Sequence, residues 1–241
     1  MTDSDHLSVV IPAYNEAAVI GSTLESVVSS LTAGGVSHEI LVVDDGSTDA
    51  TASLVRQAAE RRPQIRLLAS GHQGKGGAVK HGVLAATGRY VLFLDADYST
   101  RIEEWEKLRP WLTKGYEVVI GSRRMGGAEI VRRQSSLRRF LGSGFLWLTN
   151  AMLSIGVTDV TCGFKAFDTD VARTLFERQR LNGWGFDAEV LFLARRFGYR
   201  VKEVPVVWRN DATSNVRLWK DIVRSGLELV EIRCHALRGH Y

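Results

Sequence analysis

The sequence predicts an α/β fold in which a mostly parallel sheet is flanked by helices. Short runs rich in β-branched and aromatic residues alternate with segments whose apolar positions recur at helical spacing. Strands that alternate with helices in this way form βα units, and such units build parallel sheets. The alternation continues through residue 97, so we expect a Rossmann-like sheet at least that far. With 241 residues and 45% hydrophobic content, the chain can form a substantial core, and we expect one domain over residues 1–241.

The first half of the chain contains four expected strands and three helices. They are a strand at 7–11 halted by Pro12, a helix at 17–31, a strand at 39–43, a helix at 49–62, a strand at 65–68, a helix at 74–86 and a strand at 90–94. Beyond Asp97 we expect helices at 103–113, 171–176, 188–197 and 218–237, and strands at 117–120 and 201–208. The segment 131–155 is basic at first and then apolar.

Composition and charge limit the partners and the cellular compartment that we expect for the protein. Lys and Arg number 31 against 27 Asp and Glu, and this small basic excess suits anionic partners, among which we expect no nucleic acid. The two cysteines, Cys162 and Cys234, lack zinc-ligand spacing and fit a reducing compartment. The acidic, polar residues 1–6 do not have the order of regions of a secretory signal. No stretch reaches the roughly 20 apolar residues of a spanning helix. We therefore expect a cytoplasmic protein that meets a membrane only at its surface.

Two carboxylates, Asp95 and Asp97, follow the expected strand at 90–94. In open α/β sheets, ligands bind beyond the carboxyl ends of the strands. Carboxylate oxygens suit Mg²⁺ or Mn²⁺, and these ions commonly reach a protein bridged to substrate phosphates. The pair therefore predicts a site for a cation and a diphosphate. The alternative is a solvated pair of aspartates that merely ends a strand.

Polar residues also follow the neighbouring strands. Pro12 to Glu16 follow the first strand, and Asp44-Asp45-Gly46-Ser47 follow the second. Asp45 could equally be an N-cap or Asx-turn residue, because Asp before Gly and Ser is ordinary turn chemistry. The loop Gly74-Lys75-Gly76-Gly77 permits close backbone approach and offers a lysine to a phosphate or a base, or simply begins a helix.

Six motifs in this order resemble glycosyltransferase family 2 over almost the entire chain. The last two of the six are Gly121-Ser122-Arg123 and Thr161-Cys162-Gly163-Phe164-Lys165. The segments 162–167, 183–189 and 203–208 resemble most the dolichyl-phosphate glucosyltransferases and bacterial polyprenyl-phosphate glycosyltransferases, with dolichyl-phosphate mannose synthases close behind. The resemblance implies a GT-A fold, a nucleotide-sugar donor, a divalent cation, Mg²⁺ or Mn²⁺, and inversion at the anomeric carbon. Tyr98-Ser99 departs from the Leu-Gln of mannose synthases, which disfavours mannose.

The resemblance also implies roles for individual residues. Asp95 and Asp97 would bind the metal, and Asp97, Arg123 and Asp187 would be catalytic. The donor would be bound by the residues Pro12, Tyr14, Glu16, Asp44, Asp45, Lys75, Asp95 and Ala96. Trp184 could stack on a sugar or fill the core. Residues 1–122 would form the nucleotide-sugar-binding half and residues 123–241 the acceptor-binding, membrane-proximal half.

The acceptor side is predicted from basic residues. A guanidinium at Arg123 can bind phosphate oxygens through two parallel hydrogen bonds. Lys165 and Arg209 are further candidates for contacts with an acceptor phosphate. A basic run precedes an apolar segment, which indicates a membrane-surface element, although a solvated helix face is the alternative. The run consists of Arg132, Arg133, Arg138 and Arg139.

We therefore expect transfer of a hexose, glucose from UDP-glucose, to a polyprenyl or dolichyl phosphate at the cytoplasmic membrane face. A lipid phosphate has a second pKa of about 6, so it is already largely ionised at neutral pH and needs no strong base. GDP-mannose is the alternative donor. A saccharide acceptor would instead require a base such as Asp187. A binding protein or scaffold without turnover has no need of the combined carboxylates and cations.

Overall fold

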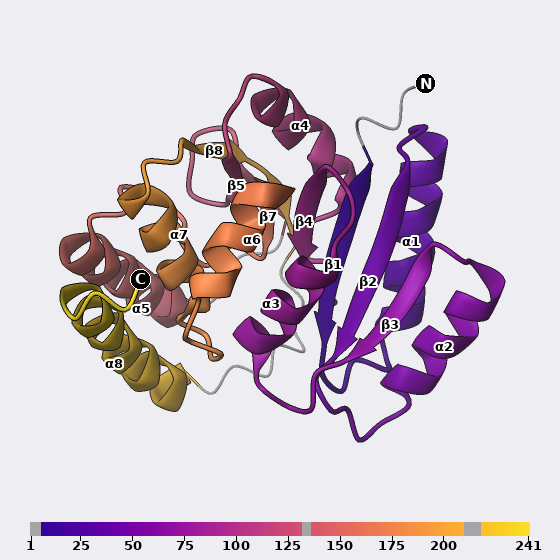
Figure 1. The fold of residues 1–241 in the computed structure, drawn as a ribbon, viewed down its shortest axis with the longest axis horizontal. Coiled ribbons are helices and arrows are strands. Elements are labelled where there is room, and N and C mark those ends of the chain that lie inside the picture. The colour runs from indigo at the N-terminus through magenta and orange to yellow at the C-terminus, as the bar shows by residue number, and fades with distance from the viewer. Residues whose placement is uncertain (1–5, 132–135, 210–217) are drawn as a thin grey trace.

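The computed structural model describes residues 6–131, 136–209 and 218–241 and contains a seven-stranded sheet (Figure 1). The strands run in the order β3-β2-β1-β4-β7-β5-β8. Their bounds are β1 Leu7–Ala13, β2 His38–Asp44, β3 Ile65–Ala69, β4 Tyr90–Leu94, β5 Val118–Ser122, β7 Phe164–Asp168 and β8 Val201–Pro205. Strands β1 to β4 pair in parallel, which confirms the parallel sheet expected for the first half of the chain.

Strand β7 is antiparallel to both of its neighbours, β4 and β5. The sequence analysis did not predict this strand. Because it runs backwards, its first residues lie at the edge where β4 and β5 end: Phe164 pairs with Leu94, and Lys165 pairs with Phe93. The motif of residues 161–165 therefore reaches the same edge as Asp95 and Asp97.

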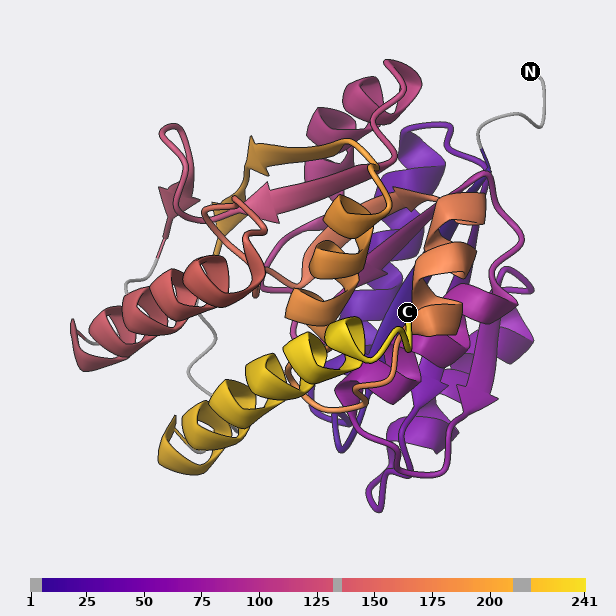
Figure 2. The same ribbon diagram turned by 60° about the vertical axis from the view of Figure 1, so that its left-hand side comes forward.

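Helices cover both faces of the sheet (Figures 1 and 2). On one face, α1 (Ile20–Ala33), α2 (Thr51–Arg61) and α4 (Trp105–Thr113) pack into one apolar core. On the other face, α3 (Lys75–Ala85), α6 (Thr169–Arg178) and α7 (Phe186–Arg196) pack into a second core. A short 3₁₀ helix, Ile102–Glu104, leads into α4. These helices agree with those expected from the sequence, with ends that differ by a few residues.

Two long helices, α5 (Ser136–Leu153) and α8 (Leu218–Leu237), lie side by side at the outer edge of the second core (Figure 2). Leu153 from α5 and Leu229 and Ile232 from α8 are buried in that core. No helix within the described ranges is both long and apolar enough to cross a membrane.

Two expectations about strand ends were wrong. Strand β1 does not stop at Pro12 but continues to Ala13, with Pro12 opposite Val43. The pairing with β4 ends already at Val10 and Phe93, so Pro12 lies where β1 has one partner strand and the missing N–H is tolerated. The strand expected at 201–208 is divided: β8 belongs to the main sheet, and β9 (Val207–Trp208) pairs with β6 (Glu129–Ile130).

Candidate active site

The candidate site lies at the edge of the sheet where β1, β2 and β4 end. These three strands are neighbours and parallel, so the residues that follow them meet at one edge. Strand β5 ends there too, followed by Arg123, because β4 and β5 are both antiparallel to β7. The fold thus brings the expected donor motifs together with Arg123.

Asp45 holds the loop that leads into α3. Its side chain is buried, and its carboxylate accepts hydrogen bonds from Ser70 Oγ at 2.6 Å, Gln73 N at 2.7 Å and Gly74 N at 2.9 Å. The Asx turn that the sequence suggested for Asp45 belongs to Asp44, whose Oδ1 accepts from the backbone N–H of Ser47 at 3.2 Å. Asp45 therefore fixes the start of α3 from the end of β2.

Tyr14 and His72 form an exposed aromatic pair at this edge. Their ring centroids are 4.6 Å apart, and Tyr14 is 43% exposed. His72 Nδ1 lies 2.9 Å from the backbone oxygen of Asp45. The loop after β1 is fixed as well, since the Glu16 N–H donates to Thr51 Oγ1 at 2.8 Å. An exposed ring on a fixed loop suits stacking with a nucleobase. His72 was not predicted, because a histidine in a polar loop gives no sequence signal.

Asp95 and Asp97 lie beside Lys75. Lys75 Nζ is 2.7 Å from Asp95 Oδ1, and Asp97 Oδ1 accepts from the Ser99 N–H at 2.9 Å. Burial, together with the negative charge of Asp95, raises the pKa of Asp97 above its usual range. Burial acts to lower the pKa of Lys75, but the carboxylates of Asp95, Asp187 and Asp97 raise it above its ordinary value.

The charge of Asp95 disfavours the ionisation of Asp97, and a divalent cation bound to both carboxylates would relieve this repulsion. Within the described part of the chain, no group of three or more His, Cys, Asp or Glu side chains surrounds a possible ion position. Mg²⁺ is often bound by one or two carboxylates while substrate phosphates complete its shell, so Asp95 and Asp97 are a candidate ligand pair.

Gly163 leaves room for the carboxylate of Asp95. A Cβ atom at Gly163 would overlap Asp95 Oδ2, and the Asp95 N–H donates to the Gly163 carbonyl at 3.2 Å. Ala96 between the two aspartates packs into the core, and its carbonyl accepts from Thr23 Oγ1 at 2.9 Å. The side chain of Ala96 is therefore buried, and the donor contact expected for this residue stays a prediction for its backbone.

Lys165 and Asp187 form a buried ion pair. Lys165 Nζ is 2.5 Å from Asp187 Oδ1 and donates to the Cys162 carbonyl at 2.6 Å, and both side chains are at most 5% exposed. Burial raises the pKa of Asp187, against the opposing charges of Lys165 and Lys75. The contact expected between Lys165 and an acceptor phosphate does not fit this geometry, because the ammonium is buried and already paired.

Arg123 is held by Asp159, a residue that the sequence analysis did not single out. Arg123 Nε donates to Asp159 Oδ2 at 2.7 Å and Nη2 to Oδ1 at 2.8 Å, and the guanidinium lies 5.4 Å from the ring of Trp208. The loop of Asp159 is fixed by Glu203, which accepts from the Thr158 and Asp159 N–H groups. No sequence motif marks such partners, because they come together only in the fold.

Arg209 lies next to the Asp97 loop, since its N–H donates to the Ser99 carbonyl at 2.8 Å and its side chain is exposed. The expected membrane residues Arg132 and Arg133 lie outside the described residues. Arg138 and Arg139 belong to the first turn of α5.

Trp184 stands on a loop that is held from three sides. The Asn182 carbonyl accepts from Gly76 N at 2.8 Å, Glu228 of α8 accepts from Gly185 N at 2.7 Å, and Glu189 accepts from Leu181 N at 2.9 Å. The side chain of Trp184 is 43% exposed, with Lys75 Nζ 5.0 Å from its ring. Trp184 therefore faces the site and does not fill the core.

The Asn182 contact also explains the glycines of the loop before α3. A Cβ atom at Gly74 would lie 2.7 Å from the Asn182 carbonyl oxygen, and one at Gly76 would lie 2.6 Å from Phe186 Cβ. These glycines are thus required for packing against residues 181–186. In the first turn of α3, the N–H groups of Gly76 and Gly77 already donate to the Asn182 carbonyl.

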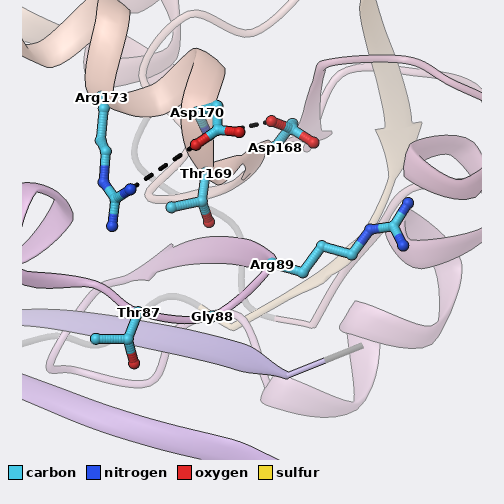
Figure 3. Close-up of a pocket in the computed structure, with 7 residues that line it drawn as sticks. All are labelled: Thr87, Gly88, Arg89, Asp168, Thr169, Asp170 and Arg173. Atoms are coloured by element: carbon cyan, nitrogen blue, oxygen red, sulfur yellow. Dashed lines mark hydrogen bonds and ion pairs between the residues drawn. The ribbon is translucent and has the colours of Figure 1, made fainter. Parts of the chain in front are cut away.

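A separate cavity of about 380 Å³ lies at the opposite edge of the sheet, between the start of β4 and the start of α6 (Figure 3). Two arginines and two aspartates line it; Arg173 points toward Asp170, whereas the Arg89 side chain points away from both aspartates. Asp168 already accepts from the N–H groups of Asp170 and Val171. The cavity contains none of the motif residues and is not part of the candidate site.

Comparison with known proteins identifies the family. The family model of glycosyl transferase family 2 matches residues 8–176. A dolichyl-phosphate beta-glucosyltransferase of Dictyostelium discoideum is 34% identical over 98% of this chain and 76% of its own length. One from Trichomonas vaginalis is 38% identical over 95% of this chain and 71% of its own.

Solved structures share the fold. Glucosyl-3-phosphoglycerate synthase of Mycobacterium tuberculosis, in complex with Mn²⁺, UDP-glucose and glycerol 3-phosphate, superimposes with a TM-score of 0.70 over 95% of this chain and 80% of the other, at 21% identity. The neighbours are GT-A glycosyltransferases, and the fold expected from the sequence is confirmed. The chain belongs to glycosyltransferase family 2 and has the GT-A fold.

Proposed function

We propose that this glycosyltransferase transfers glucose from UDP-glucose to the phosphate of a polyprenyl or dolichyl lipid, with inversion at the anomeric carbon. The observation that carries the proposal is the meeting of Asp95, Asp97, Lys75 and Arg123 at one edge of the sheet. The identities of 34% and 38% to dolichyl-phosphate beta-glucosyltransferases support the sugar and the acceptor.

The chemistry requires charge stabilisation more than proton transfer. A phosphate oxygen of the lipid attacks the anomeric carbon, and the bond from that carbon to the diphosphate oxygen breaks. The attacking phosphate is already ionised, and the leaving diphosphate gains negative charge. A divalent cation held by Asp95 and Asp97 would act as a Lewis acid for the leaving group. Arg123, oriented by Asp159 and Thr161, binds phosphate oxygens with the N–H groups that these two residues do not use.

Asp187 has a positioning role, through its ion pair with Lys165, and is not the catalytic base. Its carboxylate is buried and bound to the Lys165 ammonium, so a proton acceptor facing the substrate would first have to break that pair. The pair instead fixes β7 against α7, beneath Lys75 and Asp95. This geometry favours a phosphate acceptor over a saccharide acceptor, which would need a base.

The acceptor half, residues 123–241, contacts the cytoplasmic face of the membrane through α5 and α8. Trp147 on α5 is 72% exposed and Leu227 on α8 is 67% exposed, and both are side chains that a lipid surface accommodates. Residues 1–122 bind the nucleotide sugar.

The test is a panel of labelled nucleotide sugars, including UDP-glucose and GDP-mannose, incubated with a polyprenyl phosphate and Mg²⁺ or Mn²⁺ before lipid extraction. We expect label in the lipid from UDP-glucose. Label from GDP-mannose alone would reassign the donor, and unlabelled lipid with every donor would refute the proposal.

A further inference from the structure

The ammonium of Lys75 lies where a cation for Asp95 would have to bind. Its Nζ is 2.7 Å from Asp95 Oδ1, and the two side chains are only 22% and 30% exposed. The ammonium also lies 5.3 Å from the ring of Phe93 and 5.0 Å from that of Trp184. Without bound ligands, the counter-ion of the Asp95 carboxylate is therefore the Lys75 ammonium.

Lys75 is presented from a fixed backbone. Gly74, which precedes it, donates its N–H to Asp45 Oδ2 at 2.9 Å. Gly76, which follows it, donates its N–H to the Asn182 carbonyl at 2.8 Å. The ammonium can therefore change partners by side-chain rotation while its Cα stays in place.

Among the residues that the structure describes, Lys75 has few alternative anions nearby. Asp187, whose charge also acts on Lys75, is bound to Lys165 at 2.5 Å, and Asp97 belongs with Asp95 to the proposed cation site. If Asp95 turns to a divalent cation, the anion left for Lys75 has to come from the ligand. A nucleoside diphosphate at the same edge supplies it.

We propose that Lys75 is the counter-ion that Asp95 releases when a divalent cation binds, and that the ammonium then pairs with the donor diphosphate. The proposal rests on the proposed function, since it uses the same cation and donor. Without a diphosphate, the cation has to displace Lys75 from Asp95. With a diphosphate, the displaced ammonium has a partner. Lys75 therefore couples cation binding to donor binding, in addition to direct contact between the two ligands.

The experiment measures Mn²⁺ binding by calorimetry, with and without saturating UDP, in the wild type and in Lys75→Met. In the wild type we expect Mn²⁺ to bind more tightly when UDP is present. Without UDP, we expect Mn²⁺ to bind about tenfold more tightly to Lys75→Met than to the wild type. With saturating UDP, we expect Mn²⁺ to bind the variant and the wild type with nearly the same affinity. The enhancement by UDP then shrinks by about the same factor.

Controls separate this role from a general charge effect. Lys114→Met removes a lysine that lies over the ring of Trp111 at the end of α4, away from the site, and should leave both affinities unchanged. Lys75→Gln provides a second uncharged variant should Lys75→Met unfold, which circular dichroism would reveal.

Two results would overturn the proposal. If Lys75→Met tightens Mn²⁺ binding equally with and without UDP, Lys75 only repels the cation and does not exchange partners. If neither affinity changes, Lys75 does not compete for Asp95. A wild-type protein that binds neither Mn²⁺ nor UDP would contradict the proposed function itself, which is a different outcome.

Discussion

Asp159 binds Arg123 with two parallel hydrogen bonds, from Nε at 2.7 Å and from Nη2 at 2.8 Å, and also accepts from the Arg123 backbone N–H at 3.0 Å. Asp159 is only 2% exposed, and its pKa is lowered, because the hydrogen bonds and charge of Arg123 outweigh the effect of burial. The guanidinium is therefore aimed by a partner on the loop before β7.

Removing Asp159 should leave the partly buried guanidinium of Arg123 without its counter-ion and the Arg123 N–H without its acceptor. We expect Asp159→Ala to lower the free energy of unfolding by about 3–5 kcal/mol, measured by urea denaturation at pH 7. Asp170→Ala is the matched control, since Asp170 is 94% exposed and 3.7 Å from Arg173. A loss for Asp159→Ala no larger than that of the control would contradict the importance of this pair.

A second prediction concerns the room that Gly163 leaves for Asp95. Gly163→Ala places a methyl group in the position of the Asp95 carboxylate, so Asp95 has to move. We expect transfer activity to fall about 100-fold, since a displacement of about 1 Å can have that effect, while circular dichroism shows a folded protein. Gly126→Ala is the control, because its Cβ would meet nothing within 4 Å. Full activity in Gly163→Ala would show that the position of Asp95 is not critical.

A third prediction concerns pH and Asp97. The pKa of Asp97 is raised in the folded state by burial and by Asp95, so the folded protein holds this proton more tightly than the unfolded chain does. Ionised Asp97 therefore destabilises the fold. The free energy of unfolding falls as pH rises from the unfolded pKa of about 3.9 through the raised pKa of the folded state.

Asp97→Asn removes that titration and should keep the acceptor for the Ser99 N–H. In metal-free buffer we expect the variant to have a higher Tm than the wild type at pH 7, with the difference shrinking as pH falls toward about 4. Transfer activity should be lost in the same variant. A Tm difference that does not depend on pH would contradict the raised pKa of Asp97.

A fourth prediction concerns the basic run of Arg132, Arg133, Arg138 and Arg139. Changing Arg132, Arg133, Arg138 and Arg139 to Gln should weaken flotation with anionic vesicles by at least about tenfold, since each basic residue near such a surface contributes about 1 kcal/mol. Changing Arg56, Arg61 and Arg62, at the other end of the molecule on and after α2, should have little effect. Unchanged flotation of the first variant would show that the run does not bind the membrane surface and would favour the alternative, a solvated helix face.

The sequence predicted the parts of this structure that depend on local pattern. Alternating apolar runs and helical periodicity predicted β1 to β4 and the helices between them, and the order of strand ends placed Asp45 and Asp95 at one edge. Turn chemistry did not decide which aspartate forms the Asx turn. Asp44 does so, while Asp45 turns inward to the loop before α3.

Long-range partners could not be predicted in this way. Strand β7 contains a buried lysine, which no local pattern marks as core, and Lys165 is stabilised there only because Asp187 arrives from α7. The pairs of Arg123 with Asp159 and of Gly185 with Glu228 join residues separated by 36 and 43 positions. Such contacts are set by the packing of whole elements, so single motifs do not contain them.

The most direct test of the account is a comparison of two acceptors that differ only in the phosphate. The protein is incubated with labelled UDP-glucose and Mn²⁺, together with either a polyprenyl phosphate or the corresponding polyprenol, and the initial rates of lipid labelling are measured. We predict labelling of the phosphate alone, because the cations of the site suit an ionised acceptor, whereas Asp187, the base expected for an alcohol, is paired with Lys165. Equal labelling of the polyprenol, or labelling of neither lipid, would contradict the account.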